Sequence, residues 1–403
     1  MSRSRLHRNV IALGLVSLLT DFSSEMIYPL LPVFLTAVLG AGPAALGIIE
    51  GVAETTASLL KLFSGVWSDR VGRKKPLVVA GYALSTAARP LVGIATAWGH
   101  VLAIRFGDRI GKGVRTSPRD ALVAASVAPD DRGRAFGLQR AMDHLGAVIG
   151  PLVAFLLLAG AGLSYRPVFL LSVIPGLAAV AALLFFVREP AGTAPAHAGG
   201  RLRDGGLPPA FRRYLLIVCL FTLGNASDAF LILRAVDAGV PAAYVPLLWG
   251  GFNLVKSTLS TPAGILSDRW SRKTLIVGGW LVYAACYGAW AFARGPAWVV
   301  GLFLAYGLFA AATEGAERAF VADFVPPERR GTAFGWFHLA VGIAALPASV
   351  VFGIVWSRYG AAAAFGMSAC LAIAASGLLV ALPAPRVMSP SGLSASGRAP
   401  GSP

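Results

Sequence analysis

Apolar stretches of about 20 residues recur along the whole chain, separated by short connections that are rich in Lys and Arg. A helix needs about 20 consecutive, mainly apolar residues to cross the hydrocarbon core of a bilayer. Only 13% of the 403 residues are charged, whereas a soluble domain of ordinary composition carries about 25% charged residues. The sequence therefore predicts an all-α protein that is embedded in a lipid bilayer, and it argues against a soluble protein.

The apolar stretches predict twelve transmembrane helices in two pseudo-symmetric bundles of six. The predicted spans cover residues 9–38, 44–67, 75–97, 99–127, 134–160, 165–187, 213–236, 242–267, 274–293, 296–321, 332–356 and 361–383.

The net charge of +16 follows the connections between these spans. Most of the 35 Lys and Arg residues lie in the termini and in the even-numbered connections, while only Arg166, Arg294 and Arg358 lie in or directly beside the opposite set of loops. Cytoplasmic loops are enriched in Lys and Arg. The pattern predicts an inner-membrane protein with both termini in the cytoplasm, and it explains the charge without a nucleic-acid partner.

Composition also divides the chain into five parts. We predict a cytoplasmic N-terminus at residues 1–8, a six-helix half at 9–187, a linker at 188–212, a second half at 213–383 and a disordered cytoplasmic tail at 384–403. The linker is rich in Ala, Gly, Pro and Arg, which is typical of a flexible segment. The first apolar stretch continues past two acidic residues without a cleavage site of small residues, which indicates an uncleaved helix rather than a signal peptide.

The two predicted halves contain a sequence repeat. Residues 65–75 read GVWSDRVGRKK and residues 264–274 read GILSDRWSRKT, at an offset of 199 (264 − 65). Residues 132–137 read RGRAFG and residues 330–335 read RGTAFG, at an offset of 198 (330 − 132). Repeats of six helices are found in membrane transporters.

The first repeated segment closely resembles the signature loop of the major facilitator superfamily, and the second is a weaker copy because Ser271 replaces a glycine. The resemblance covers residues 9–383. It implies alternating access around a central cavity that is lined mainly by helices 1, 4, 7 and 10. It also implies a small-molecule substrate and function as a monomer.

In this family the signature loop forms a gating clasp, in which an acidic residue caps a helix of the other half. Asp69, Arg73 and Asp120 would form that clasp here, with Asp69 near Thr332, whereas Arg318 occupies the position equivalent to Asp120 and makes a second clasp doubtful. The alternative is an ordinary positively charged cytoplasmic loop. The full set of predicted gating residues is Gly65, Asp69, Arg70, Gly72, Arg73 and Asp120, with Gly264, Asp268, Arg269 and Arg272 in the second copy.

The fourth predicted span carries a polar stripe within an arc of about 140° when successive residues are placed at the 100° spacing of an α-helix. Ile104, Phe106, Ile110 and Val114 are expected on its other side. A cavity wall that attracts anionic or proton-bearing groups is one interpretation, and a ladder of ion pairs between helices is the other. The stripe residues expected in the substrate cavity are Arg105, Asp108, Arg109, Lys112 and Arg115.

Two acidic residues of the first span, Asp21 and Glu25, lie one helical turn apart. Asp21 falls near the middle of the membrane at a rise of 1.5 Å per residue. Loss of water favours the protonated carboxyl group there unless a cation lies nearby. We predict proton coupling at both residues, with a fixed ion pair as the alternative. The following Pro29 and Pro32 resemble the first-helix motif of proton-driven exporters.

Further charged residues are weaker candidates. Asp228, Glu314 and Glu317 lie in spans that line the cavity in this family, so we assign them to the substrate cavity as well. Glu50 and Glu54 in the second span, and Asp143 and His144 in the fifth, are less specific. Cys219, Cys286 and Cys370 lie inside spans without metal-ligand spacing, so we expect no metal and no cofactor.

The fifth span contains Gly146 and Gly150 followed by Pro151, which resembles the antiporter motif of the family. The Gly-xxx-Gly spacing lets two helices approach closely. Together with the first-span motif, it predicts a secondary active transporter that exports a small organic solute by proton antiport. The alternative is a proton symporter that imports an anionic metabolite or a metal chelate. The sequence contains no enzyme motif, so we predict that the chain is not an enzyme.

Overall fold

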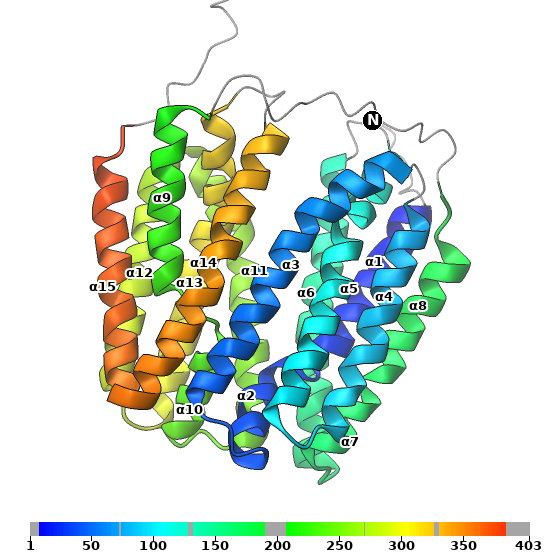
Figure 1. Cartoon of the computed structure of the whole chain (residues 1–403), viewed down its shortest axis with the longest axis horizontal. Helices are drawn as coiled ribbons and strands as arrows, with labels where there is room; N and C mark the ends of the chain where they lie inside the picture. The colour runs from blue at the N-terminus through cyan, green and yellow to red at the C-terminus, as the bar shows by residue number, and fades with distance from the viewer. Residues whose placement is uncertain are drawn as a thin grey trace, which may run out of the picture.

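A computed structural model describes residues 8–71, 74–127, 132–189, 207–269, 271–325 and 330–383. Within these ranges the chain is helical and contains no β-strand. Figure 1 shows two groups of helices that lie side by side, one formed by the N-terminal elements and one by the C-terminal elements. The upper side of this view, where α1 begins at Arg8, is called the Arg8 end below.

The N-terminal group contains six membrane-length helical segments. The first segment comprises α1 (Arg8–Glu25), η1 (Tyr28–Leu30), α2 (Leu31–Val33) and η2 (Phe34–Val38). The second is α3 (Pro43–Val71), the third α4 (Lys75–Ala88) with η3 (Arg89–Ile94), and the fourth α5 (Trp98–Ala125). The fifth is α6 (Arg132–Phe155) with η5 (Leu156–Gly160), and the sixth is α7 (Tyr165–Leu171) with α8 (Val173–Phe186).

The C-terminal group also contains six segments. They are α9 (Pro209–Gly224) with α10 (Ala229–Asp237), η6 (Ala242–Tyr244) with α11 (Val245–Arg269), α12 (Arg272–Phe292), α13 (Pro296–Asp323), α14 (Arg330–Tyr359) and α15 (Ala361–Ala381).

These segments confirm the predicted all-α membrane fold. In the described part of the chain, nine helical segments are both long and apolar enough to cross a bilayer. The other three, α3, α5 and α11, have 29, 28 and 25 residues, so they have the length of a span but a more polar composition. A polar helix can cross a membrane only where neighbouring helices or an aqueous cavity receive its charges. These three helices therefore point to the polar interior of the protein.

Two of the segments are interrupted inside the membrane. The first changes helix type around Pro29 and Pro32, because proline has no backbone N–H and clashes with the preceding turn. The seventh opens between Gly224 and Ala229. The Tyr283 hydroxyl donates to the Gly224 carbonyl oxygen at 2.7 Å. Irregular backbone of this kind is tolerated in a membrane only where it is buried in protein or lines a cavity.

The two groups of helices touch mainly through α3 and α14. At Gly47, Gly51 and Gly353 the helices are so close that a Cβ atom would collide with the backbone of the other helix. The contact continues as far as Ser58, which lies against Gly342. Beyond that point, toward the Arg8 end, α3 and α14 diverge (Figure 1). At the opposite end, α10 packs against α2 and α3.

The predicted close approach of Gly146 and Gly150 is also present, within the N-terminal group. A Cβ atom at Gly150 would lie 2.7 Å from the Phe22 carbonyl oxygen and 2.9 Å from the Glu25 Cβ atom. These two glycines thus let α6 pack directly against α1, the helix that carries Asp21 and Glu25.

Much of the predicted gating clasp lies outside what the structure describes. Gly72 and Arg73 are not among the described residues, and neither are the central linker at 190–206 and the tail from 384 onward. Gly65, Asp69, Arg70, Gly264, Asp268 and Arg269 belong to α3 and α11, but their side-chain positions are not described. Asp120 pairs with its neighbour Arg119 at 2.9 Å. The clasp therefore stays a prediction.

The α3–α14 contact allows a direct test of the packing between the groups. We expect Gly47→Ala to lower the melting temperature of the detergent-purified protein by several degrees, because the new methyl group meets the Ser349 backbone oxygen, which cannot move aside. Gly278→Ala is the matched control, since no atom lies within 4 Å of its Cβ position. Equal melting temperatures for the two variants would contradict this packing.

Candidate functional site

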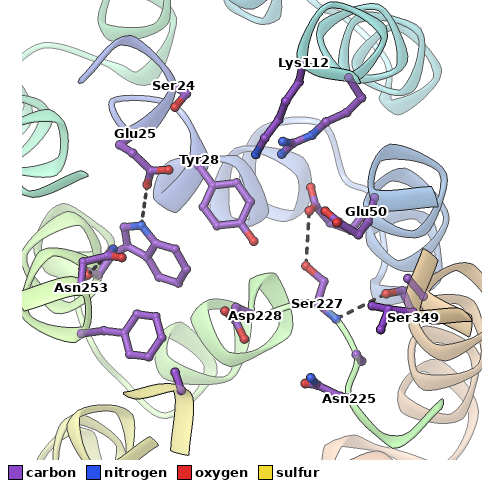
Figure 2. A pocket seen from close by; sticks show the side chains of 18 of the residues that line it. Ser24, Glu25, Tyr28, Glu50, Lys112, Asn225, Ser227, Asp228, Asn253 and Ser349 are labelled. Atoms are coloured by element: carbon purple, nitrogen blue, oxygen red, sulfur yellow. Dashed lines mark hydrogen bonds between the residues drawn. The ribbon is translucent and has the colours of Figure 1, made fainter. Parts of the chain in front are cut away.

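A cavity of about 640 Å³ lies between the two groups of helices, and side chains from both groups line it (Figure 2). Its volume falls in the range of pockets that hold small organic molecules. All ten residues that the sequence assigned to proton coupling or to the substrate cavity line it. They are Asp21, Glu25, Arg105, Asp108, Arg109, Lys112, Arg115, Asp228, Glu314 and Glu317.

The polar stripe of α5 faces this cavity, and part of it is neutralised by neighbouring helices. The Arg105 guanidinium donates to Glu50 Oε1 on α3 at 2.6 Å, and the exposed fractions of the two side chains are 9% and 7%. Asp108 accepts from Arg89 Nε at 2.9 Å, and Arg89 also donates to the Thr20 carbonyl oxygen on α1. Removing one partner of such a buried pair leaves an uncompensated charge. These two pairs thus fix α5 against α1, α3 and η3.

Two other cations of the stripe are not held in this way. Arg109 approaches Asp108 only at 4.0 Å, and its Nε atom has no hydrogen-bond partner among the described residues. For the ammonium group of Lys112, the described part of the chain supplies no hydrogen bond and no ion pair within 4.0 Å, while its backbone oxygen accepts from Thr116 Oγ1. Figure 2 shows its ammonium group directed into the cavity. The stripe thus combines both sequence interpretations, with ion pairs between helices at one set of positions and free donors at another.

The cavity-facing arc of α5 is wider than the sequence pattern predicted. Ile104 was placed on the apolar side, yet it lines the cavity. It lies four positions before Asp108, so the two lie only about 40° apart around the helix. Ile110 and Val114 are not among the lining residues, which agrees with the predicted apolar face.

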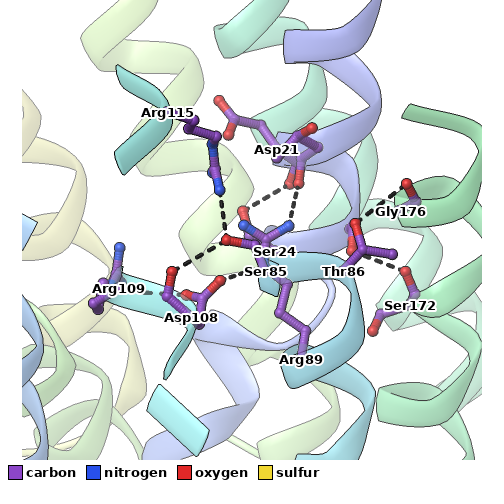
Figure 3. Close-up of polar contacts among 12 residues, drawn as sticks. Asp21, Ser24, Ser85, Thr86, Arg89, Asp108, Arg109, Arg115, Ser172 and Gly176 are labelled. Carbon is purple, nitrogen blue, oxygen red and sulfur yellow. Dashed lines mark hydrogen bonds and ion pairs between the residues drawn. The ribbon is translucent and has the colours of Figure 1, made fainter. Parts of the chain in front are cut away.

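Arg115 lies deeper in the N-terminal group. It donates to Ser85 Oγ at 2.5 Å and stacks over the Tyr82 ring, with 4.5 Å between its Cζ atom and the ring centroid. Figure 3 shows the guanidinium directed at Ser85 rather than at the nearby Asp21. Ser85 in turn donates to the Asp108 carbonyl oxygen. Arg115 is therefore held by neutral partners.

Asp21 lies on the cavity wall without a close partner for its carboxylate. In Figure 3 it is the backbone carbonyl oxygen of Asp21 that accepts a hydrogen bond, from Ser24 Oγ at 3.2 Å. Within the described residues, no hydrogen bond or ion pair reaches the side chain. The fixed ion pair that the sequence left open for Asp21 is thus not formed in this state. Proximity to the cavity gives the carboxylate access to water.

Glu25 differs from Asp21, because it contacts the other half of the molecule. The indole Nε1 of Trp249, on α11, donates to Glu25 Oε2 at 2.6 Å (Figure 2). Glu50 makes a similar contact, since its Oε2 atom accepts from the Ser227 hydroxyl at 3.3 Å. Ser227 belongs to the irregular segment between α9 and α10. Both carboxylates therefore connect the two groups of helices at the cavity.

The C-terminal wall of the cavity is aromatic, with its acidic side chains bound by donors of the same wall. Asp228 accepts from the Tyr306 hydroxyl at 2.7 Å, Glu317 accepts from Trp280 Nε1 at 2.9 Å, and Glu314 pairs with Lys256 at 3.3 Å. The aromatic lining residues on this side are Phe221, Trp249, Phe252, Tyr306 and Phe309.

Several lining residues were missed or underrated in the sequence. Glu50 was only a weak candidate, although it joins Arg105 to Ser227. Arg89 and Lys256 were not singled out, yet a charge inside a span is by itself a sign of a functional site. The aromatic wall gave no signal, because apolar residues in a span do not reveal which face is a cavity. Asp143 and His144 are not among the lining residues.

The second copy of the signature motif has an acidic partner that the sequence comparison overlooked. Arg272 forms an ion pair with Asp323 at the end of α13, and it also donates to the Ala319 carbonyl oxygen at 3.2 Å. The doubt about a second clasp came from Arg318, which pairs with Glu314 instead. Asp323 lies more than one helical turn further along α13, so a comparison by fixed offset did not align it.

Comparison with known proteins places these features in a family. The model of the Major Facilitator Superfamily matches residues 13–248 and 214–400. An uncharacterized MFS-type transporter of Methanocaldococcus jannaschii is 35% identical over 360 residues, covering 87% of this chain and 89% of the relative. The multidrug resistance protein MdtH of Edwardsiella ictaluri is 31% identical over 143 residues, or 36% of this chain and 35% of MdtH.

Solved structures share the fold at low sequence identity. The nucleoside transporter NupG superposes with a TM-score of 0.80 at 12% identity, covering 93% of this chain and 99% of NupG. A bacterial homologue of the human lysosomal transporter Spinster, in an inward-facing and occupied conformation, gives a TM-score of 0.71 at 17% identity over 94% and 96% of the two chains. With the family model and the archaeal relative, these similarities lead to one conclusion: this multi-pass membrane protein belongs to the Major Facilitator Superfamily.

Proposed function

We propose that the protein exports a small organic solute across the inner membrane by proton-coupled antiport, using alternating access of the central cavity. The observation that carries the proposal is the position of Asp21, a membrane-embedded carboxylate on the cavity wall without a close cationic partner among the described residues. A carboxylate in that position can take up and release a proton from the cavity. The partial match to MdtH, a multidrug resistance protein by name, supports the export direction.

The packing between the two halves supports an inward-facing state. Contacts between the halves include those at the end opposite Arg8, where α10 meets α2, and those along α3 and α14 as far as Ser58. The halves also meet between α6 and α11, and the rings of Phe155 and Tyr244 lie 5.6 Å apart beside this interface. The Arg8 end is the side that the charge distribution assigns to the cytoplasm. Alternating access then requires that the contacts at the opposite end open while the Arg8 end closes.

The alternative function is proton-coupled import of an anionic metabolite or chelate. The free donors of Arg109 and Lys112 favour an anion in the cavity, but they do not set the direction of movement. The motif resemblances in the first and fifth spans favour export. We therefore keep antiport as the main proposal.

Replacing the proposed coupling residue gives the first functional test. We expect Asp21→Asn to abolish proton movement linked to solute, because the amide cannot take up a proton, while the protein still folds. The measurement uses liposomes with an internal pH-sensitive dye and a panel of aromatic carboxylates and cationic dyes as solutes. Those solutes that cause proton movement in liposomes with the unaltered protein are then tested in liposomes with the variant.

Asp237→Asn is the matched control, since Asp237 is an exposed acidic residue of the same type that is not among the cavity-lining residues. It should leave proton movement unchanged. Full solute-linked proton movement in Asp21→Asn would remove Asp21 from the coupling mechanism.

The contacts that Glu25 and Glu50 make across the two halves give a second test. We expect the double variant Ser227→Ala, Trp249→Phe to populate the outward-open state more, because both hydrogen bonds to the other half are lost. A single cysteine at Leu231, which is 1% exposed in this state, should then react severalfold faster with a hydrophilic maleimide. The native cysteines are replaced beforehand.

The control for this experiment is Thr258→Ala, which removes a hydroxyl that is exposed and bonded only to its own helix. Labelling of Leu231→Cys should stay at its basal rate with this change. If the double variant also labels at the basal rate, the two hydrogen bonds do not stabilise the closed outer end.

A further inference from the structure

The two walls of the cavity differ in chemistry. Five of the six Lys and Arg residues that line it belong to the N-terminal group, and Lys256 is the exception. Five of its six Phe, Tyr and Trp residues belong to the C-terminal group, and Tyr28 is the exception. A molecule that fills the cavity therefore meets Lys and Arg side chains on one side, here called the cationic wall, together with Asp21, Glu25, Glu50, Glu54 and Asp108, and it meets aromatic rings on the other side.

Some hydrogen-bond donors of the cationic wall have no close acceptor among the described residues. Arg105 and Arg89 are occupied by Glu50 and Asp108. Arg109 and Lys112 lie one helical turn apart on α5, and within the described residues their donors reach no carboxylate closer than 4.0 Å. Guanidinium and ammonium groups that are withdrawn from bulk water bind carboxylate, sulfonate or phosphate oxygens through charge-assisted hydrogen bonds. This pair is thus suited to one anionic group.

The aromatic wall is a packed cluster of rings, in which Phe252 and Tyr306 are each 3% exposed in this state. Phe252 stacks on Tyr306 with 5.5 Å between ring centroids, and Tyr306 contacts Phe309 at 5.3 Å. Trp249 lies 5.2 Å from Phe252. Aromatic rings in such clusters offer faces and edges to a further ring. This wall is therefore suited to an apolar, planar body.

The carboxylates of the aromatic wall are already bound. Asp228 has Tyr306, Glu317 has Trp280 and Glu314 has Lys256 as a donor. A cationic solute lying against the rings would thus have to displace an existing donor. The other acidic lining residues belong to the cationic wall, and they are Asp21, Glu25, Glu50, Glu54 and Asp108. Asp108, Glu50 and Glu25 already accept from Arg89, Arg105 and Trp249. At Asp21 or Glu54, a cationic solute would meet repulsion from Arg109 and Lys112.

From this asymmetry we infer that the transported solute is an amphipathic aromatic anion, with its acidic group on Arg109 and Lys112 and its ring against Phe252 and Tyr306. The inference rests on the proposed function, because it names the class of solute for the same cavity. It makes no use of the proton coupling at Asp21. Binding of the solute joins the two halves, since its two ends contact different groups of helices.

Three probes that share one ring system test the charge preference. They are 2-naphthoate, 2-naphthylmethanol and 2-naphthylmethylammonium, each titrated by calorimetry into the full chain in lipid nanodiscs. We expect 2-naphthoate to bind at least tenfold more tightly than the other two. The inference is overturned if 2-naphthoate does not bind more tightly than the alcohol and the ammonium compound.

Variants then locate the two ends of the probe. Arg109→Gln and Lys112→Gln should each lower the affinity for 2-naphthoate about tenfold, the factor expected for the loss of one charge-assisted hydrogen bond. Phe252→Leu should weaken it severalfold while keeping an apolar side chain. The exposed Arg213 gives the matched control Arg213→Gln, which should bind as the unaltered chain does. Unchanged affinity in both α5 variants would overturn the placement of the anion.

The outcome is independent of the coupling test. Calorimetry needs no proton gradient, so it tests the class of solute separately from the coupling. If the ammonium compound binds more tightly, the anionic class is overturned, while solute-linked proton movement in liposomes would still support antiport. Conversely, tight binding of 2-naphthoate with full proton coupling in Asp21→Asn would leave the anionic class standing and refute the proposed coupling residue. Melting curves of each variant show whether a lost affinity reflects a lost fold.

Discussion

The buried ion pairs of α5 are the constraint on which the rest of the structure depends. An isolated α5 carries more charge than a bilayer accepts, and it gains a stable place only when Glu50 and Arg89 approach from neighbouring segments. Those two pairs set where α3 and η3 lie relative to α5. Once they are formed, the remaining polar face of α5 borders the cavity at Arg109 and Lys112. The fold and the site thus have one electrostatic origin.

Much of the architecture can be predicted from the sequence, because the bilayer imposes a length and a composition on each span. The interruption of the first segment at Pro29 and Pro32 has such a local cause, and within the described residues the predicted spans and the observed helices agree closely. The opening of the seventh segment at Asn225 has no such local signal. It depends on partners from elsewhere in the chain, such as Tyr283 and Ser349, which bond to its backbone.

The sequence identifies the charged residues of the candidate site, but it does not identify their partners. Asp21, Arg109 and Lys112 stand out because charge inside a span is rare. Sequence spacing does not show that Arg105 has an ion-pair partner while the described residues give none to Lys112. This difference depends on which helix faces each residue. It also cannot separate aromatic residues of a packed core from those of a cavity wall. Trp249 looks like any apolar span residue until the structure brings its indole to Glu25.

The repeat explains how one cavity acquires two unlike walls. Helices α5 and α13 begin and end at the same offset, 296 − 98 and 323 − 125, which is 198 in both cases. At that offset Asp108 corresponds to Tyr306, and Lys112 corresponds to Ala310, and all four line the cavity. The two helices therefore present the same face, while the side chains on it have diverged from charged to aromatic or small. Pseudo-symmetry preserves the two six-helix groups, and loss of symmetry at these positions gives the cavity one wall with charged side chains and one wall with aromatic side chains. A solute that uses both walls binds best when the two halves are close to it, so its binding energy can favour the occluded state through which alternating access must pass.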